Sequence, residues 1–137
     1  MIYLLIFLVK TLFIITIPLL AYVYISFHGA AIRDSIKLRL ALTVIIPSGS
    51  QQNATLRNVN FAMSHAIVMY SQDKSHVTIC IPTSPWWNPI PNIDTRLEIR
   101  RRLEYDGFSD YLTSEFNDYS MSPLEVDRKY FTITGDK

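Results

Sequence analysis

One long uncharged segment constrains this chain more than any other feature of its sequence. Residues 11–32 carry no charged side chain, and the ten residues before them add only Lys10. About 20 apolar residues in a helix cross the roughly 30 Å hydrocarbon layer of a membrane, and a backbone in lipid must satisfy its own hydrogen bonds. The sequence therefore predicts a transmembrane helix over residues 1–32 and a soluble domain over residues 33–137.

Two other interpretations of this segment are a buried core helix and a cleaved signal peptide. A buried core helix is disfavoured because the segment is apolar around its whole circumference. A cleaved signal peptide needs a basic start, an apolar run of about 7–15 residues and a small-residue cleavage site, which Gly29, Ala30 and Ala31 resemble. Lys10 comes too late and the run after it is too long, so the sequence favours a retained helix, kinked at Pro18.

Basic residues around the segment predict its orientation. Arg33, Lys37 and Arg39 follow it, whereas only the amino terminus and Lys10 lie before its long apolar run. Cytoplasmic flanks of membrane helices carry an excess of Lys and Arg, so we expect a cytoplasmic domain at the cell membrane. The single cysteine, Cys80, fits a reducing compartment and excludes an intramolecular disulfide.

The remaining residues are enough for one modest α/β domain. Apolar residues alternate in some segments and recur at every third or fourth position in others, which predicts strands and helices respectively. The expected elements are a strand over 35–46, a helix over 52–71, a strand over 76–81, helices over 93–106 and 109–117, and a strand over 129–134. This β-α-β-α-α-β order predicts three strands, the first two joined in a right-handed βαβ unit.

The sequence gives little support for catalysis or for a cofactor. The four glycines are Gly29, Gly49, Gly107 and Gly135, and their spacing excludes both common glycine-rich phosphate loops. The three histidines and one cysteine form no zinc-binding motif. We therefore expect a non-enzymatic protein without a metal or cofactor.

A thiol enzyme is an alternative to this expectation. It would use Cys80 as the nucleophile and His65 or His76 as its base, and it would need an exposed thiol beside a basic group. Cys80 instead lies in an apolar segment, where a free cysteine usually packs as a small hydrophobic residue.

The formal charge of +1 hides a division between two parts of the chain. Residues 33–102 contain nine basic and four acidic residues, whereas residues 103–137 contain three and eight. The densest basic cluster consists of Arg96, Arg100, Arg101 and Arg102. It is a candidate for binding anionic lipid or nucleic acid. Glu98 and Glu104 have the spacing to pair with these arginines along a helix, which would instead give a self-neutralised surface.

Residues 82–92 form the most unusual local segment. They contain four prolines, which exclude regular structure, and the adjacent Trp86 and Trp87. Neighbouring side chains of an extended loop point to opposite sides, so either both tryptophans cover the core or one is free to contact others. A free tryptophan suits the membrane interface or a partner's pocket, so both are candidate interaction residues.

The order of elements near the C-terminus resembles a known family. The segments IDTRLEIRRRLEYDGFSDYLTSEFND (93–118) and KYFTITGD (129–136) follow an N-terminal apolar helix and a small α/β region. This pattern is similar to the region ahead of the motor in FtsK/SpoIIIE-type DNA-transfer proteins of conjugative mobile elements. The resemblance covers 76–136 and implies an anchoring or assembly module. No Walker motif follows, so it implies no DNA pumping and carries over no catalytic residue.

These observations favour a non-enzymatic single-pass membrane protein. We expect its domain to dock on or scaffold a membrane-associated assembly, with DNA transfer as one candidate process. The expected partners are membrane lipids and a protein of that assembly, with nucleic acid contacted indirectly and no small-molecule substrate. The alternatives are an anionic-lipid or nucleic-acid binder acting through Arg96, Arg100, Arg101 and Arg102, and a small thiol enzyme.

Overall fold

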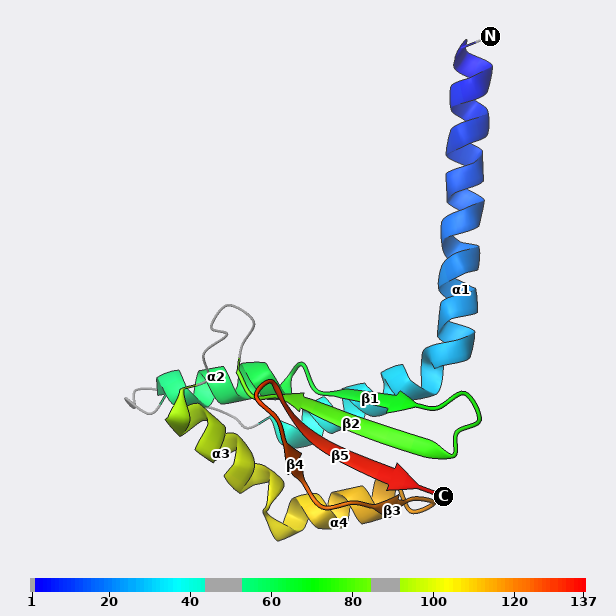
Figure 1. The fold of residues 1–137 in the computed structure, drawn as a ribbon. Helices are drawn as coiled ribbons and strands as arrows, with labels where there is room; N and C mark the ends of the chain where they lie inside the picture. The colour runs from blue at the N-terminus through cyan, green and yellow to red at the C-terminus, as the bar shows by residue number, and fades with distance from the viewer. Residues whose placement is uncertain (1, 44–52, 85–91) are drawn as a thin grey trace.

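A computed structural model of the chain describes residues 2–43, 53–84 and 92–137. It contains one very long helix, three short helices and an antiparallel sheet (Figure 1). The elements in chain order are α1 (Ile2–Leu42), α2 (Asn53–Met63), β1 (Ile67–Tyr70), β2 (His76–Pro82), α3 (Ile93–Leu103), α4 (Asp106–Glu115), β3 (Ser120–Met121), β4 (Glu125–Val126) and β5 (Tyr130–Asp136).

The helix α1 is longer than the sequence predicted. It continues for 41 residues, so the strand expected over 35–46 is wrong across its described part, which is helical up to Leu42. The alternation that suggested a strand also places Ser35, Leu38 and Leu42 on one helical face, and these three are buried while Leu40 is exposed. Leu, Lys, Arg and Ala favour helix, and extending an existing helix avoids the cost of a new nucleus.

The direction of α1 changes where the helix reaches the domain (Figure 1). The hydroxyl of Ser35 donates to the carbonyl of Ala31 at 2.6 Å, and such bonds to the preceding turn bend helices. Pro18 lies inside the helix within its apolar part, and the sharp bend of the ribbon lies nearer the domain than the predicted kink.

The sheet has the strand order β1-β2-β5-β3, with β4 also paired to β5, and every pairing is antiparallel. The predicted βαβ unit and the count of three strands are therefore wrong. The helix expected over 52–71 ends at Met63, and its last residues form β1. Residues 71–75 are too few for a crossover connection, so they join β1 and β2 as a hairpin.

The elements toward the C-terminus follow the sequence prediction closely. The strand expected over 76–81 is β2, the helices expected over 93–106 and 109–117 are α3 and α4, and the last strand is β5. Asn92 caps α3, because its side chain accepts a hydrogen bond from the amide of Asp94 at 3.3 Å. The domain is thus an α+β fold attached to one apolar helix.

Among the described residues, helices cover one face of the sheet and leave the other without a helix. The strand residues buried on this closed face are Val68, Val77, Ile79, Ile81, Phe131 and Ile133. They form one core with buried residues from α1 to α4, and α3 and α4 lie below the sheet in Figure 1. The alternate residues of the same strands form the other face, which we call the open face: Ile67, Met69, His76, Thr78, Cys80, Pro82, Tyr130, Thr132, Thr134 and Asp136.

The core contribution of α1 can be measured with a matched pair of substitutions. Leu38 is fully buried and Leu40, two residues away, is 73% exposed. We expect Leu38→Ala to lower the free energy of unfolding of the domain by about 2–5 kcal/mol, and Leu40→Ala by less than about 0.5 kcal/mol. Denaturation of the detergent-solubilised full chain, followed by near-ultraviolet circular dichroism, measures both. Equal effects of the two substitutions would contradict the helical face described here.

Candidate functional site

The domain-facing part of α1 is fixed to the edge of the sheet by its own side chains. The hydroxyl of Ser35 accepts a hydrogen bond from the amide of Val68 in β1 at 2.8 Å. The Nε of Arg39 donates to the carbonyl of Ala66, directly before β1, at 2.8 Å. An edge strand leaves backbone groups unpaired, and α1 satisfies two of them here. These two bonds therefore join the long helix directly to the edge of the sheet.

Two further contacts strengthen this junction. The hydroxyl of Tyr70 donates to Asp34 Oδ2 at 2.8 Å, and Lys37 Nζ lies 2.6 Å from Glu115 Oε2 of α4. Burial, together with the hydrogen bond to the Asp34 carboxylate, raises the pKa of Tyr70. The phenol therefore stays protonated and keeps its role as a donor at neutral pH.

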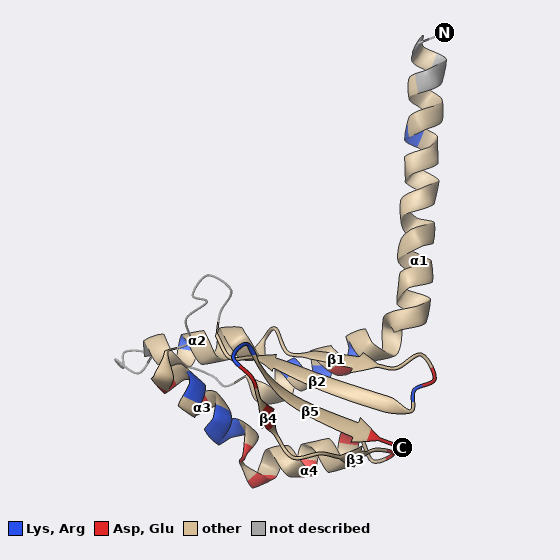
Figure 2. Cartoon of the chain, in the orientation of Figure 1, with Lys and Arg blue, Asp and Glu red and all other residues tan. Residues whose placement is uncertain are grey.

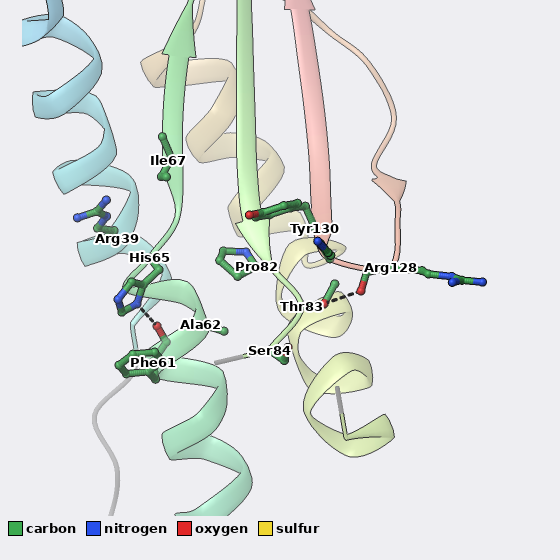
Figure 3. Close-up of a pocket in the computed structure, with 11 residues that line it drawn as sticks. Arg39, Phe61, Ala62, His65, Ile67, Pro82, Thr83, Ser84, Arg128 and Tyr130 are labelled. Atoms are coloured by element: carbon green, nitrogen blue, oxygen red, sulfur yellow. Dashed lines mark hydrogen bonds between the residues drawn. The ribbon is translucent and has the colours of Figure 1, made fainter. Parts of the chain in front are cut away.

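A pocket of about 390 Å³ opens beside this junction, at the end of the sheet where β1 begins and β2 ends (Figure 3). Ile67, Pro82 and Tyr130 line it from the open face. Thr83 holds the adjoining turn in place, since its hydroxyl donates to the carbonyl of Arg128 at 3.0 Å and its amide donates to the carbonyl of Lys129 at 2.9 Å.

The charged side chains that line this pocket, in the part of the chain that the structure describes, are Arg39, Arg128 and Lys129, and His65 lies with them. We call the site the basic pocket. Arg39 and His65 lie on one side, and Arg128 extends outward on the other (Figure 3). His65 Nδ1 donates to the carbonyl of Phe61 at 2.8 Å, and the centroids of the His65 and Phe61 rings are 4.2 Å apart. Such a pocket suits an anionic group.

The sequence did not reveal the basic pocket, because its residues come from four separate segments. The adjacent Arg128 and Lys129 were a visible signal, since they are two of only three basic residues in the acidic part of the chain. Nothing in the local sequence places them opposite Arg39 and His65. Only the pairing of β5 with β2, and of α1 with β1, brings them to one pocket.

The predicted arginine cluster divides into paired side chains on α3. Nε of Arg100 lies 2.7 Å from Glu104 Oε1, and Nε of Arg101 lies 3.0 Å from Glu98 Oε2. Arg102 is largely buried and donates from one terminal nitrogen to Asn60 Oδ1 at 3.0 Å. The pairing predicted along the helix is therefore present, and Arg102 joins α3 to α2.

Arg96 and Arg100 border a shallow groove between α3 and β4. Its apolar lining includes Ile93, Leu97 and Val126, of which Ile93 is 74% and Leu97 is 60% exposed. We call this site the α3 groove. The other predicted interaction residues, Trp86 and Trp87, lie outside the described residues.

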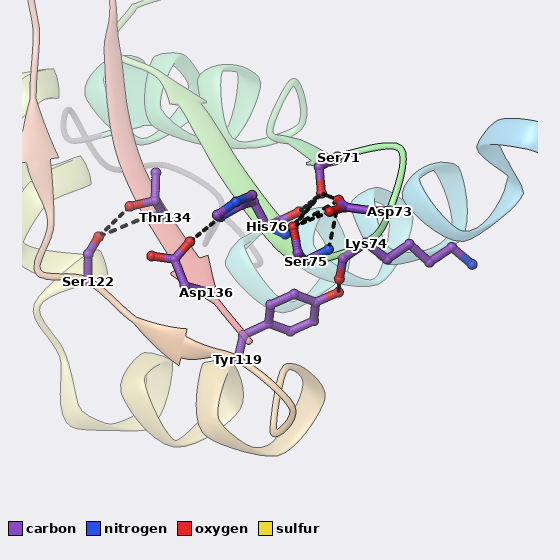
Figure 4. A network of polar contacts seen from close by, with 9 residues as sticks. All are labelled: Ser71, Asp73, Lys74, Ser75, His76, Tyr119, Ser122, Thr134 and Asp136. Atoms are coloured by element: carbon purple, nitrogen blue, oxygen red, sulfur yellow. Dashed lines mark hydrogen bonds and ion pairs between the residues drawn. The ribbon is translucent and has the colours of Figure 1, made fainter.

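The arrangement around Cys80 does not favour a thiol nucleophile. Cys80 lies on β2 beside Thr132 of β5, and burial raises the pKa of its thiol. His76 is on the same face of β2 but four residues away, which is about 13 Å along a strand. Its ring pairs instead with Asp136 (Figure 4).

Serine hydroxyls near His76 serve the β1–β2 turn. The hydroxyls of Ser71 and Ser75 donate to Asp73 at 2.6 and 2.8 Å, and these bonds hold the pKa of the Asp73 carboxyl well below its usual value (Figure 4). Within the described residues, neither hydroxyl bonds to the His76 ring, so this is no catalytic triad. The same part of the chain contains no group of three His, Cys, Asp or Glu side chains placed to hold a metal ion.

Comparison with protein-family models, curated proteins and solved structures gave no match to this chain. Its function therefore has to be argued from its own residues.

The reactivity of Cys80 tests the thiol-enzyme alternative. At pH 7.5 we expect Cys80 to react with iodoacetamide more slowly than an exposed cysteine, since only the thiolate reacts and the raised pKa reduces its fraction. The rate should rise with pH until the pH exceeds that pKa. The reference is Ser114→Cys on the exposed side of α4, in a Cys80→Ala background. Faster reaction of Cys80 than of this reference would contradict the inert role.

Proposed function

We propose that this chain is a single-pass membrane protein whose cytoplasmic domain docks on or scaffolds a membrane-associated assembly, with no catalysis of its own. One observation carries the proposal. The most apolar window of α1 is entirely exposed, while Leu38 and Leu42 on the same helix belong to the core of the domain. An exposed apolar helix of this length requires lipid around it.

Continuity of α1 supports a retained helix over a cleaved signal peptide. The small residues Gly29, Ala30 and Ala31 lie within the helix and not in an extended segment. Proteases bind their substrates in extended form, so cleavage here would first require the helix to unwind. Beyond the uncharged segment, Ile36 and Leu40 are still exposed, which suits the interface region of a membrane.

The α3 groove supports a protein partner. It combines exposed apolar side chains with arginines at its border, and protein interfaces are enriched in both. In Figure 1, α3 lies on the side of the sheet away from the apolar part of α1, where a partner can approach without meeting the membrane. The resemblance noted over residues 76–136 makes a DNA-transfer machine the first candidate assembly.

Membrane insertion is tested by fractionation. We expect the full chain to stay in the membrane pellet after alkaline carbonate extraction, at its full length on a denaturing gel. Leu20→Arg/Val23→Arg should release much of it, since each arginine near the centre of a membrane helix costs about 2.5–3.5 kcal/mol. The matched control Ile36→Arg/Leu40→Arg places the same charges beyond the span and should remain in the pellet.

The orientation is tested in the same cells. The exposed Ser114→Cys, in a Cys80→Ala background, should react with a membrane-impermeant maleimide only after the cells are opened. Labelling of intact cells, or a shortened soluble chain, would contradict the proposed topology.

Docking through the α3 groove is tested by cross-linking in native membranes. We expect the full chain to form a specific complex of defined stoichiometry, which Leu97→Gln weakens at least about tenfold because a buried apolar contact is lost. The matched control is Tyr105→Gln, a large exposed residue beyond the end of α3 that is 71% exposed against 60% for Leu97. Equal loss with both variants, or no complex with the wild type, would argue against this docking site.

A further inference from the structure

We propose that the basic pocket binds the phosphate-bearing headgroup of an anionic lipid. The inference rests on the proposed function in one respect, because it requires α1 to hold the domain beside a membrane. It goes beyond that function by assigning a ligand and a site. The site is separate from the arginine cluster of α3 that the sequence put forward.

The charge of the pocket is the first argument. Arg39, Arg128 and Lys129 are permanent cations, His65 lies with them, and the described lining contains no carboxylate. By contrast, Arg100, Arg101 and Arg102 of α3 are paired with Glu98 and Glu104. Arg39 lies at the pocket and the Arg128 side chain extends outward from its rim (Figure 3), so the surroundings of the pocket have a positive potential that an anion relieves.

Hydrogen-bond donors are the second argument. Arg39 uses its Nε–H for the carbonyl of Ala66, which fixes the guanidinium at the pocket and leaves its terminal N–H groups for a ligand or solvent. Ser84 also lines the pocket and carries a hydroxyl, whereas the hydroxyl hydrogen of Thr83 is already donated to the carbonyl of Arg128. A planar guanidinium matches phosphate oxygens in geometry as well as in charge.

The location of the pocket favours a lipid as the source of the phosphate. The apolar part of α1 rises from the domain on the side opposite to α3 and α4 (Figure 1), and the pocket is on the open face, which is also opposite to these helices. Figure 2 places basic residues at the turn between β4 and β5, where Arg128 and Lys129 lie. Basic pockets close to a membrane bind anionic headgroups.

The aromatic lining of the pocket agrees with this location. Tyr130 is 44% exposed and extends over the open face toward Pro82 (Figure 3). Tyrosine is enriched at the level of lipid headgroups, where its ring contacts apolar groups and its hydroxyl stays hydrated. A volume of about 390 Å³ suits a single headgroup better than a folded partner or a nucleic-acid duplex.

The test measures lipid binding by the detergent-solubilised full chain. Its thermal unfolding midpoint is followed while dioctanoyl phosphatidylglycerol, dioctanoyl phosphatidylcholine or inorganic phosphate is added. We expect a saturable rise with phosphatidylglycerol alone. Arg128→Gln/Lys129→Gln should weaken the apparent affinity about 30-fold, given the usual contribution of each cation near anionic lipid. Both side chains are exposed, and Thr83 contacts only their backbone, so the variant keeps its fold.

A matched variant distinguishes binding at this pocket from a non-specific effect of the protein's positive charge. Arg100→Gln/Arg101→Gln removes the same two charges from α3, on the other side of the sheet, and should leave the lipid response unchanged. An equal loss with both variants, no rise with phosphatidylglycerol, or an equal rise with inorganic phosphate would each overturn the proposal. Carbonate extraction of the Arg128→Gln/Lys129→Gln protein distinguishes the two proposals. If this protein stays in the membrane but no longer responds to lipid, the result concerns the basic pocket alone and leaves anchoring and docking unaffected.

Discussion

The attachment of α1 to the edge strand β1 is the contact on which the rest of the structure depends. Ser35 and Arg39 bond to backbone groups of Val68 and Ala66, and Leu38 packs in the core directly beside them. The same eight or so residues therefore end the apolar helix, close the edge of the sheet and supply one wall of the basic pocket. Because these roles share one short helical segment, no flexible linker separates the apolar part of α1 from the core of the domain.

The sheet has two different surfaces, and this difference organises the proposed functions. Its closed face is filled by apolar side chains from all four helices, whereas its open face carries threonines, Cys80 and a few half-exposed apolar residues. The apolar part of α1 rises on the side of the domain opposite to α3, so the proposed lipid contact and the proposed protein contact lie on different sides. The basic pocket and the α3 groove, to which these proposed contacts are assigned, share no lining residue.

Local sequence patterns predicted the elements that have one buried face or a clear capping residue. The strands β2 and β5 alternate because one face is buried, and α3 begins at its Asn92 cap. Periodicity failed for residues 35–42, because their apolar positions fit both a strand and a helix. These residues are helical because they continue the preceding part of α1. Periodicity also failed for Ile67 to Tyr70, whose spacing continues that of α2, although pairing with β2 makes them a strand. Within the described residues, β3 and β4 have two residues each, too short for any periodicity to identify.

The sequence by itself determined that this chain has one helix apolar enough to span a membrane, because exclusion of charge over 22 residues is a property of consecutive positions. It also excluded glycine-rich phosphate loops, which require specific neighbours along the chain. Only the tertiary structure decided that Arg39 and His65 lie across a pocket from Arg128, and that Arg102 is used internally. These facts depend on which strand pairs with which and on how helices pack, and such long-range contacts leave no regular pattern in the sequence.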